Sequence, residues 1–148
     1  MKFMIPFIAW LFSLSVFSQS GKQKEMLLVS TVYYGQKCEH VAFRVTPKKI
    51  EIDNCYNSET NEFKTSKTID VQSERVIQVI YKMSIQDLKY YQKQIEAVKD
   101  CDTIKPIKIR VNEKGITTEI EWNGITNCYP QSVRKVVESL ELLFIKYK

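Results

Sequence analysis

The chain has 148 residues, of which 22 are basic and 17 acidic, so its formal net charge at pH 7 is +5. The positive charge is spread along the sequence without a run of five or six basic residues, so a nucleic-acid partner is not expected. Only four glycines occur, and the sequence contains neither a glycine-rich nucleotide-binding loop nor a G-x-S-x-G hydrolase motif.

The chain begins with an apolar segment that is typical of a secretory signal peptide. Lys2 supplies a positive charge, 3–17 is almost entirely apolar, and small residues follow where a signal peptidase cleaves. The apolar run is shorter than the roughly 20 residues that a membrane-spanning helix needs. We therefore predict a signal peptide over 1–18, with cleavage after Ser20 as the alternative. The remainder, 19–148, is expected to be one secreted or periplasmic domain that is not inserted in a membrane.

The next segments have the composition and alternation of β-strands. Met26 to Tyr34 is rich in branched and aromatic residues, which favour a strand. Apolar and polar residues alternate over 41–54 on both sides of a turn that contains Pro47. This pattern predicts a hairpin in which Val45 faces Ile50, because that register brings the apolar side chains of both strands to one face.

The middle of the chain changes from a strand period to a helix period. Glu62 to Val71 is a polar segment that we interpret as a strand, and Arg75 to Met83 has apolar residues on both parities, which suits a central strand. Ser84 and Asp87 then have the spacing of a capping box. Apolar residues follow at intervals of three and four, which predicts an amphipathic helix that ends near Lys99.

A second hairpin and a last helix complete the predicted elements. Apolar and polar residues alternate from Ile107 to Trp122 around a turn that contains glycine. We expect Val111 to face Ile116, which also places Lys108 opposite Glu119. An apolar stripe at helical spacing follows Pro130, a residue that is well tolerated in the first turn of a helix.

Together these elements predict an α+β domain. The order is about five strands, a helix, a hairpin and a terminal helix. We therefore expect an antiparallel sheet of about five to seven strands with two helices packed on it.

Four cysteines predict two disulfides. An even number of cysteines in an exported chain is typical of a disulfide framework. Cys38 and Cys55 flank the first hairpin, and Cys101 and Cys128 flank the second, so we predict that each pair closes the open end of its hairpin. A zinc site is not expected, because no C-x-x-C spacing occurs.

The sequence offers few candidates for catalysis. His40 is the only histidine, and its position at the entry to a strand is typical of a turn residue. Glu119 and Glu121 share one face of a predicted strand, and Asp100 and Asp102 flank a cysteine, so a carboxylate-based hydrolase is an alternative. We predict no catalytic residue, no metal and no cofactor.

The eight tyrosines are the feature that most favours a binding role. Tyr56 and Tyr129 each follow a cysteine and are expected to form an exposed patch at the hairpin ends, where tyrosine would anchor a partner. Trp122 ends an alternating strand and is expected in the core. The sequence thus favours a non-catalytic, monomeric module of the inhibitor or immunity type that binds another exported protein. The alternatives are a small-ligand carrier or an envelope structural protein.

Overall fold

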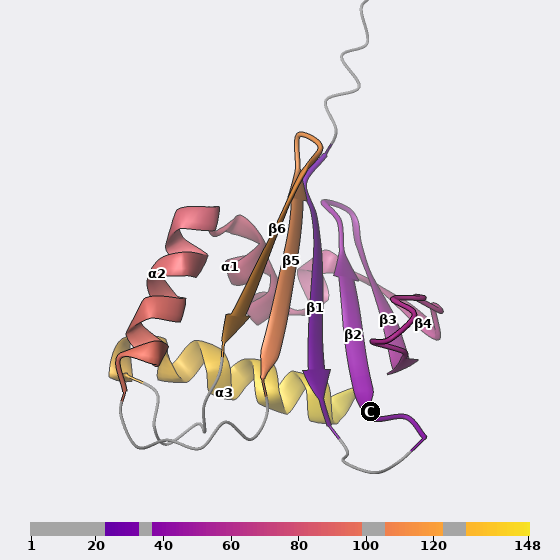
Figure 1. Ribbon diagram of the computed structural model, residues 1–148. Coiled ribbons are helices and arrows are strands. Elements are labelled where there is room, and N and C mark those ends of the chain that lie inside the picture. The colour runs from indigo at the N-terminus through magenta and orange to yellow at the C-terminus, as the bar shows by residue number, and fades with distance from the viewer. Residues whose placement is uncertain (1–22, 33–36, 99–105, 123–129) are drawn as a thin grey trace, which may run out of the picture.

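The computed structural model describes residues 23–32, 37–98, 106–122 and 130–148. Within these ranges the chain forms a six-stranded antiparallel sheet and three α-helices, an α+β architecture with the predicted number of strands (Figure 1). The strands are β1 (Glu25–Thr31), β2 (His40–Val45), β3 (Lys49–Tyr56), β4 (Lys67–Asp70), β5 (Ile107–Glu113) and β6 (Ile116–Trp122). The helices are α1 (Arg75–Lys82), α2 (Ile85–Glu96) and α3 (Gln131–Lys146), and a short 3-10 turn, Val71–Ser73, precedes α1.

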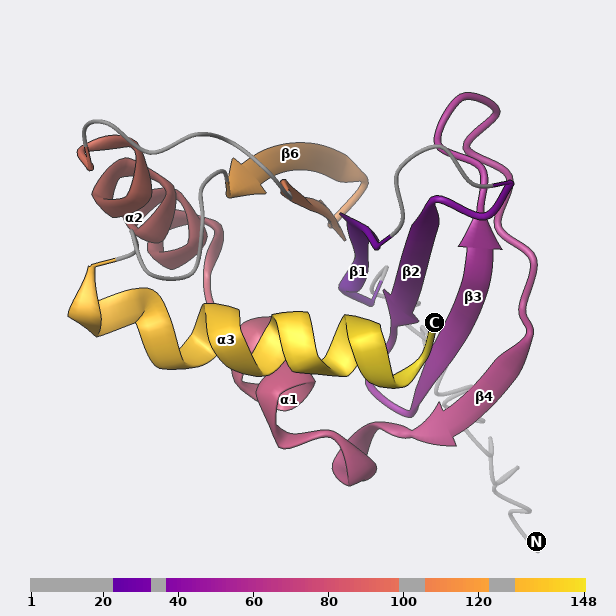
Figure 2. The same ribbon diagram turned by 90° about the horizontal axis from the view of Figure 1, so that it is seen from below.

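The first strand of the chain lies in the middle of the sheet. The strand order is β4-β3-β2-β1-β5-β6, and each neighbouring pair is antiparallel. The chain therefore builds one half of the sheet outward from β1, passes through α1 and α2, and returns to pair β5 with the free side of β1. Figure 2 shows the curved sheet wrapping around α3, with α1 beside that helix and α2 near β6.

The main core lies between the sheet and the helices. It is formed by the apolar side chains of alternate strand positions together with the inner faces of the three helices. Phe43 on β2 packs against Phe144 on α3, with ring centroids 4.8 Å apart. Trp122 is buried, as predicted, and its indole N–H donates to the carbonyl of Leu88 at 3.2 Å. That bond satisfies the one polar group of the indole and joins β6 to α2.

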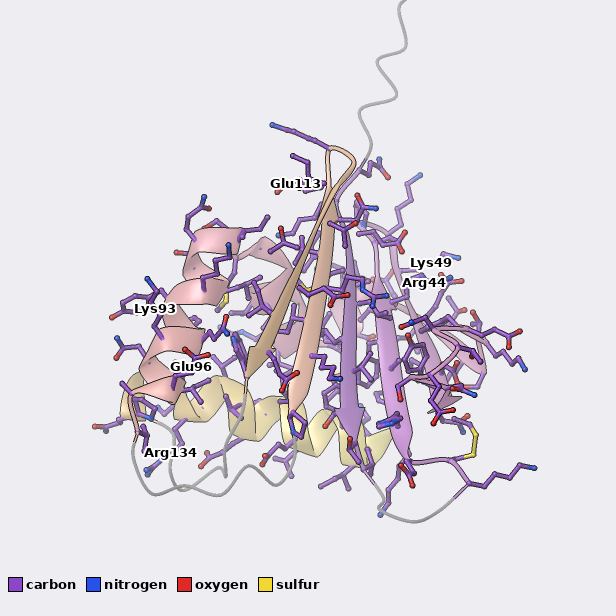
Figure 3. All side chains as sticks on the ribbon, in the orientation of Figure 1. Arg44, Lys49, Lys93, Glu96, Glu113 and Arg134 are labelled. Atoms are coloured by element: carbon purple, nitrogen blue, oxygen red, sulfur yellow. A yellow bond between two sulfur atoms is a disulfide. The ribbon has the colours of Figure 1, made fainter. Side chains whose placement is uncertain are left out.

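The β2–β3 hairpin and its disulfide confirm the first prediction of strand pairing. Val45 faces Ile50 in the ladder, as the alternation indicates. Cys38 and Cys55 form a disulfide at the open end of the hairpin, with their Cα atoms 4.5 Å apart (Figure 3). The register shifts just before the last pair of the ladder, His40 with Tyr56, because β3 has one more residue than β2 between this pair and the pair of Ala42 with Asp53.

The prediction of a central strand over Arg75–Met83 is wrong, because this segment forms α1. Apolar residues on both parities of a short segment are also compatible with a helix, in which residues three or four apart share a face. Ile77 and Ile80 are fully buried in the core, whereas Val79 is exposed. Among the described residues there are therefore three helices, against the two expected, and four strands precede them, against about five expected.

The register of the β5–β6 hairpin differs from the prediction by two residues. Val111 faces Thr118, and Glu113 faces Ile116, so the loop contains only two residues. Both of them, Lys114 and Gly115, have positive φ angles, which is the requirement of a tight type I′ hairpin turn. A shift of two residues keeps every side chain on its predicted face.

The shifted register also changes the charged pairs on the hairpin. Lys108 faces Glu121 rather than Glu119, and Glu119 faces Arg110. The predicted opposition of Lys108 and Glu119 is therefore wrong, although the opposition of acidic and basic residues on that face is retained.

Other boundaries move by a few residues. The polar strand predicted over 62–71 is reduced to the four residues of β4. The capping box at Ser84 and Asp87 is confirmed in both directions, and α2 ends at Glu96, before the predicted end near Lys99. The second predicted disulfide lies outside the described residues, as do Tyr129, Asp100 and Asp102, and it stays a prediction for Cys101 and Cys128.

Candidate functional site

The face of the sheet opposite the helices carries a second, smaller apolar cluster. Its buried members are Val29, Ala42 and Tyr56, and two partly buried side chains, Leu27 and Phe63, pack against them. No helix residue belongs to this cluster, and in Figure 2 α1 and α3 lie on the inner side of the curved sheet, with α2 beside β6 at its end. Below, we call this side of the sheet the helix-free face.

The segment 57–66 folds over part of the helix-free face. The ring of Phe63 lies 6.2 Å from that of Tyr56, and the guanidinium carbon of Arg44 lies 4.2 Å from the Phe63 ring centroid. Asn61 has a φ angle of 53°, and its side-chain oxygen accepts a hydrogen bond from the Tyr56 hydroxyl at 3.2 Å. These contacts make segment 57–66 a fixed wall on the sheet.

A buried carboxylate holds this wall in place. Asp53 on β3 is only 2% exposed. One of its carboxylate oxygens accepts from the backbone N–H of Cys55 at 2.9 Å, and the other accepts from the backbone N–H of Lys64 at 2.7 Å. Ser66 adds two bonds to the carbonyl of Ile52, one from its backbone N–H at 2.7 Å and one from its hydroxyl at 2.9 Å. The end of the segment is thus fixed to the strand that precedes it.

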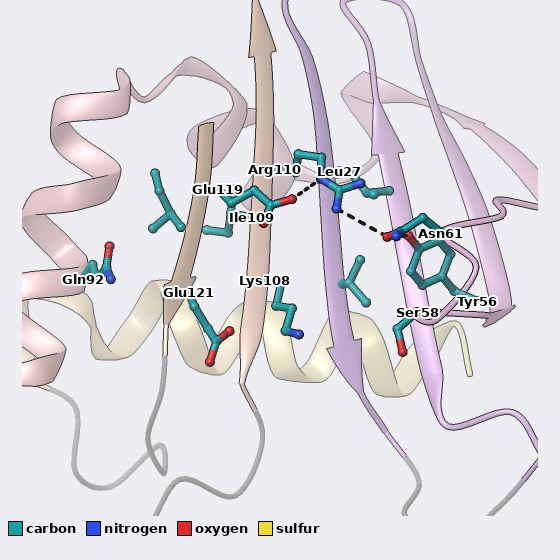
Figure 4. Close-up of a pocket in the computed structure, with 12 residues that line it drawn as sticks. Leu27, Tyr56, Ser58, Asn61, Gln92, Lys108, Ile109, Arg110, Glu119 and Glu121 are labelled. Atoms are coloured by element: carbon teal, nitrogen blue, oxygen red, sulfur yellow. Dashed lines mark hydrogen bonds and ion pairs between the residues drawn. The ribbon is translucent and has the colours of Figure 1, made fainter. Parts of the chain in front are cut away.

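Between this wall and the β5–β6 hairpin lies an open groove of about 410 Å³ (Figure 4). Its apolar floor includes Leu27, Val29 and Tyr56, and its polar rim includes Ser58 and Asn61 on one side. The polar groups on the other side are Lys108, Arg110, Glu119, Glu121 and Gln92. A second hollow of about 160 Å³ adjoins it and shares Leu27, Asn61 and Arg110.

The charged groups of the rim are arranged in rows along the strands. The Nε atom of Arg110 lies 2.7 Å from Glu119, and its Nη2 atom donates to the side-chain oxygen of Asn61 at 3.3 Å. Arg110 therefore spans β1 and links the hairpin to segment 57–66, as the dashed lines in Figure 4 show. Lys108 lies two residues away on the same face of β5 and is exposed.

The structure places the predicted site residues in different surroundings. Tyr56 is 4% exposed, so the expectation of an exposed Tyr56 is wrong. Its ring forms part of the groove and is covered by segment 57–66, because its hydroxyl and ring find partners there. His40 begins β2, and its Nδ1 atom lies 3.1 Å from the hydroxyl of Thr31. Glu119 and Glu121 both line the groove, as their shared strand face indicates.

Groups with displaced pKa values occur outside the groove. Burial lowers the pKa of Lys24, whose ammonium donates to the carbonyls of Tyr81 and Met83 at 2.6 and 2.7 Å. Burial likewise raises the pKa of Tyr81, and its hydroxyl donates to the carbonyl of Lys24 at 2.6 Å. This reciprocal clamp fixes the start of β1 to the end of α1. It has an architectural role, because each polar atom is engaged with main-chain atoms.

The described residues contain no group of three or more His, Cys, Asp or Glu that could hold a metal ion. Over the same part of the chain, no helix is long and apolar enough to cross a membrane. Comparison with protein-family models finds no match, and no curated protein matches the chain.

Sequence reasoning did not identify the groove. Its floor is recognisable only in retrospect, because Leu27 and Val29 are apolar residues on the otherwise polar parity of a strand. A strand that is apolar on both parities indicates cover on both faces. In β1 the second cover is segment 57–66, which leaves part of the floor open.

Proposed function

We propose that this chain is a small exported protein-binding module of the inhibitor or immunity type, and that its partner contacts the groove on the helix-free face. The observation that carries this proposal is the apolar floor of Leu27, Val29 and Tyr56 between a fixed wall and a charged hairpin. Apolar surface with a polar rim is the usual anatomy of a protein interface.

The shape of the groove favours an extended segment of a partner. The two hollows adjoin along the sheet and share Leu27, so together they offer an elongated depression that the hydrogen bond from Arg110 to Asn61 crosses. Their wall is fixed by Asp53 and Asn61, so little ordering of the wall is needed when a partner binds. Export is supported by the predicted signal peptide and by the Cys38–Cys55 disulfide, because such bonds persist mainly in oxidising compartments.

A small-ligand carrier is the second candidate. The volume of about 410 Å³ falls within the range of roughly 300 to 1,000 Å³ that is typical of small-molecule sites. The groove is open along one side, whereas such sites usually enclose most of a ligand, so we place the carrier second.

The proposal is tested by site-specific photo-crosslinking of the mature, oxidised protein in the extracellular or envelope fraction of its source. A crosslinker replaces Ser58 on the groove wall or, as a control, the exposed Gln86 on α2. We expect one saturable protein adduct from position 58 and none from position 86.

Two leucine variants show whether that adduct depends on the groove. Leu27→Lys places a charge on the floor, whereas Leu142→Lys makes the same change at a leucine that is 68% exposed on α3. The first variant should lose the adduct and the second should keep it, provided that circular dichroism shows both to be folded. A partner captured equally by both variants would exclude the groove as its binding site.

A further inference from the structure

The cations of the groove lie closer to its floor than the carboxylates do. Lys108 and Arg110 are on β5, which is the direct neighbour of β1 and its floor residues. Glu119 and Glu121 are on β6, one strand further from β1. The space above the floor therefore has two basic side chains at its border on one side, and the opposite wall contributes the neutral groups of Ser58 and Asn61.

The two basic side chains differ in whether they already have a hydrogen-bond or ion-pair partner. Arg110 is bound on both sides, by Glu119 and by Asn61. Lys108 lies opposite Glu121 in the ladder, but within the described ranges no ion pair or hydrogen bond of its ammonium is formed. Lys108 is thus the basic group of the groove that can bind an incoming anion without losing an existing partner.

We propose that the groove receives an acidic, extended segment of the partner, and this inference rests on the proposed function. A carboxylate of the segment pairs with Lys108, and apolar side chains on either side of it pack on Leu27, the partly exposed residue of the floor, and on the small exposed parts of Val29 and Tyr56. Side chains two residues apart in an extended segment point to the same face, so an apolar–acidic–apolar pattern at alternate positions fits the site. The full chain has a formal charge of +5, and loss of the predicted signal peptide removes only the charge of Lys2, so the mature protein stays positive, which favours the approach of an acidic partner.

Because Glu121 lies opposite Lys108, the affinity for an acidic segment can be changed in both directions by substitution. Glu121 faces Lys108 and competes with the incoming carboxylate for the same ammonium. Glu121→Gln should therefore tighten the binding of an acidic segment, while Lys108→Met should weaken it and leave the apolar stem of the side chain in place.

The test is a titration of the oxidised mature protein, labelled with ¹⁵N, with two synthetic peptides followed by NMR. The first is an acetylated and amidated heptapeptide with threonine at its odd positions, leucine at positions 2 and 6 and glutamate at position 4. The second has glutamine at position 4. We expect saturable shifts in β1, β5 and segment 57–66, with the glutamate peptide binding about ten times more tightly, equivalent to about 1.4 kcal/mol.

Variants of two lysines show whether that preference arises at the groove. Lys108→Met should abolish the preference for the glutamate peptide. Lys89→Met, the same change at an exposed lysine on α2, should keep it. Equal affinity for the two peptides, no saturable shift with either peptide, or a preference that survives Lys108→Met would overturn the inference. The crosslinking experiment does not depend on the charge of the partner, so it can still support a groove-bound partner in each of these cases.

Discussion

At the scale of single residues, Asp53 has the clearest structural role in the candidate site. A buried carboxylate is costly unless hydrogen bonds compensate it. Here both oxygens are used, and both donors are backbone N–H groups, those of Cys55 and Lys64. The sequence shows Asp53 only as a polar residue near the end of a strand, so the pattern gives no sign that it fixes the groove wall.

Replacing Asp53 with alanine should destabilise the protein and release segment 57–66. Two backbone N–H groups would lose their acceptor, at a cost of about 1 to 3 kcal/mol for each group that is left both shielded from water and unsatisfied. Urea unfolding measures the loss, and hydrogen exchange at the amide of Lys64 reports the release. Glu62→Ala removes an exposed carboxylate from the same segment and should change the free energy of unfolding by less than about 0.5 kcal/mol. Unchanged protection at Lys64 in the Asp53 variant would contradict this role.

Other residues could be interpreted from the sequence to different extents. Trp122 was correctly expected in the core, because its parity in an alternating strand decides its face. The burial of Tyr56 cannot be predicted in this way, because its cover comes from segment 57–66. The contacts of that segment depend on the left-handed backbone of Asn61. Such contacts between segments leave no periodic signal.

At the scale of secondary-structure elements, the open end of the first hairpin is closed by a disulfide as well as by its ladder. The last strand pair lies beyond a bulge, and the disulfide closes the chain directly beside it. Cys38 and Cys55 are 17 residues apart, and closing a loop of that length stabilises a fold by about 3 kcal/mol in the chain-entropy model.

The double variant Cys38→Ser, Cys55→Ser should therefore lose about 3 kcal/mol of unfolding free energy. Denaturant unfolding under oxidising conditions measures this loss. The same experiment on the reduced wild-type chain tests the second predicted disulfide. If Cys101 and Cys128 are joined, reduction should cost more stability than the double variant does. An equal loss would argue against that second bond.

Elements differ in how well their patterns specify them. The turn of the β2–β3 hairpin was placed correctly, and the register followed from it. In the β5–β6 hairpin a two-residue turn replaces the longer one that was expected, because Lys114 adopts the left-handed conformation that is usual for glycine. The α1 segment is short and apolar on both parities, so its period cannot separate a strand from a helix; only its packing in the core does so.

At the scale of the whole molecule, one polar cluster connects distant parts of the chain. Glu74, just before α1, accepts hydrogen bonds from the Lys146 ammonium and the Tyr147 hydroxyl, each at 2.7 Å. The Tyr147 ring packs edge-on against Phe43, 5.8 Å between centroids. The end of α3 is thereby tied both to the start of α1 and to the sheet.

This cluster should make stability depend on pH in the acid range. Burial acts to raise the pKa of Glu74, but the bonds from Lys146 and Tyr147 outweigh it and hold the pKa below its ordinary value of 4.5. The unfolded chain then binds a proton more tightly than the folded chain, so the contribution of Glu74 is fully present above about pH 4.5 and is lost as pH falls through the folded pKa.

Urea unfolding of wild type and Glu74→Gln between pH 7 and pH 3 checks this expectation. The difference in unfolding free energy between the two proteins should be largest near neutral pH and should shrink below about pH 4.5. Glu59→Gln, at an exposed residue of segment 57–66, should show no such trend. A difference for Glu74→Gln that is constant with pH would mean that its carboxylate is not preferentially charged in the folded state.

The position of β1 in the sheet has a consequence for biosynthesis. Its second neighbour, β5, begins at Ile107, about 80 residues after β1 itself, so a chain emerging from the ribosome can complete β1, β2 and β3 long before that partner exists. During this interval one side of β1 presents unpaired backbone groups next to the side chains of Met26 and Leu28, and exposed edges of this kind pair readily with other chains. We therefore expect a chain that has not yet formed β5 to be more prone to aggregation than the complete protein.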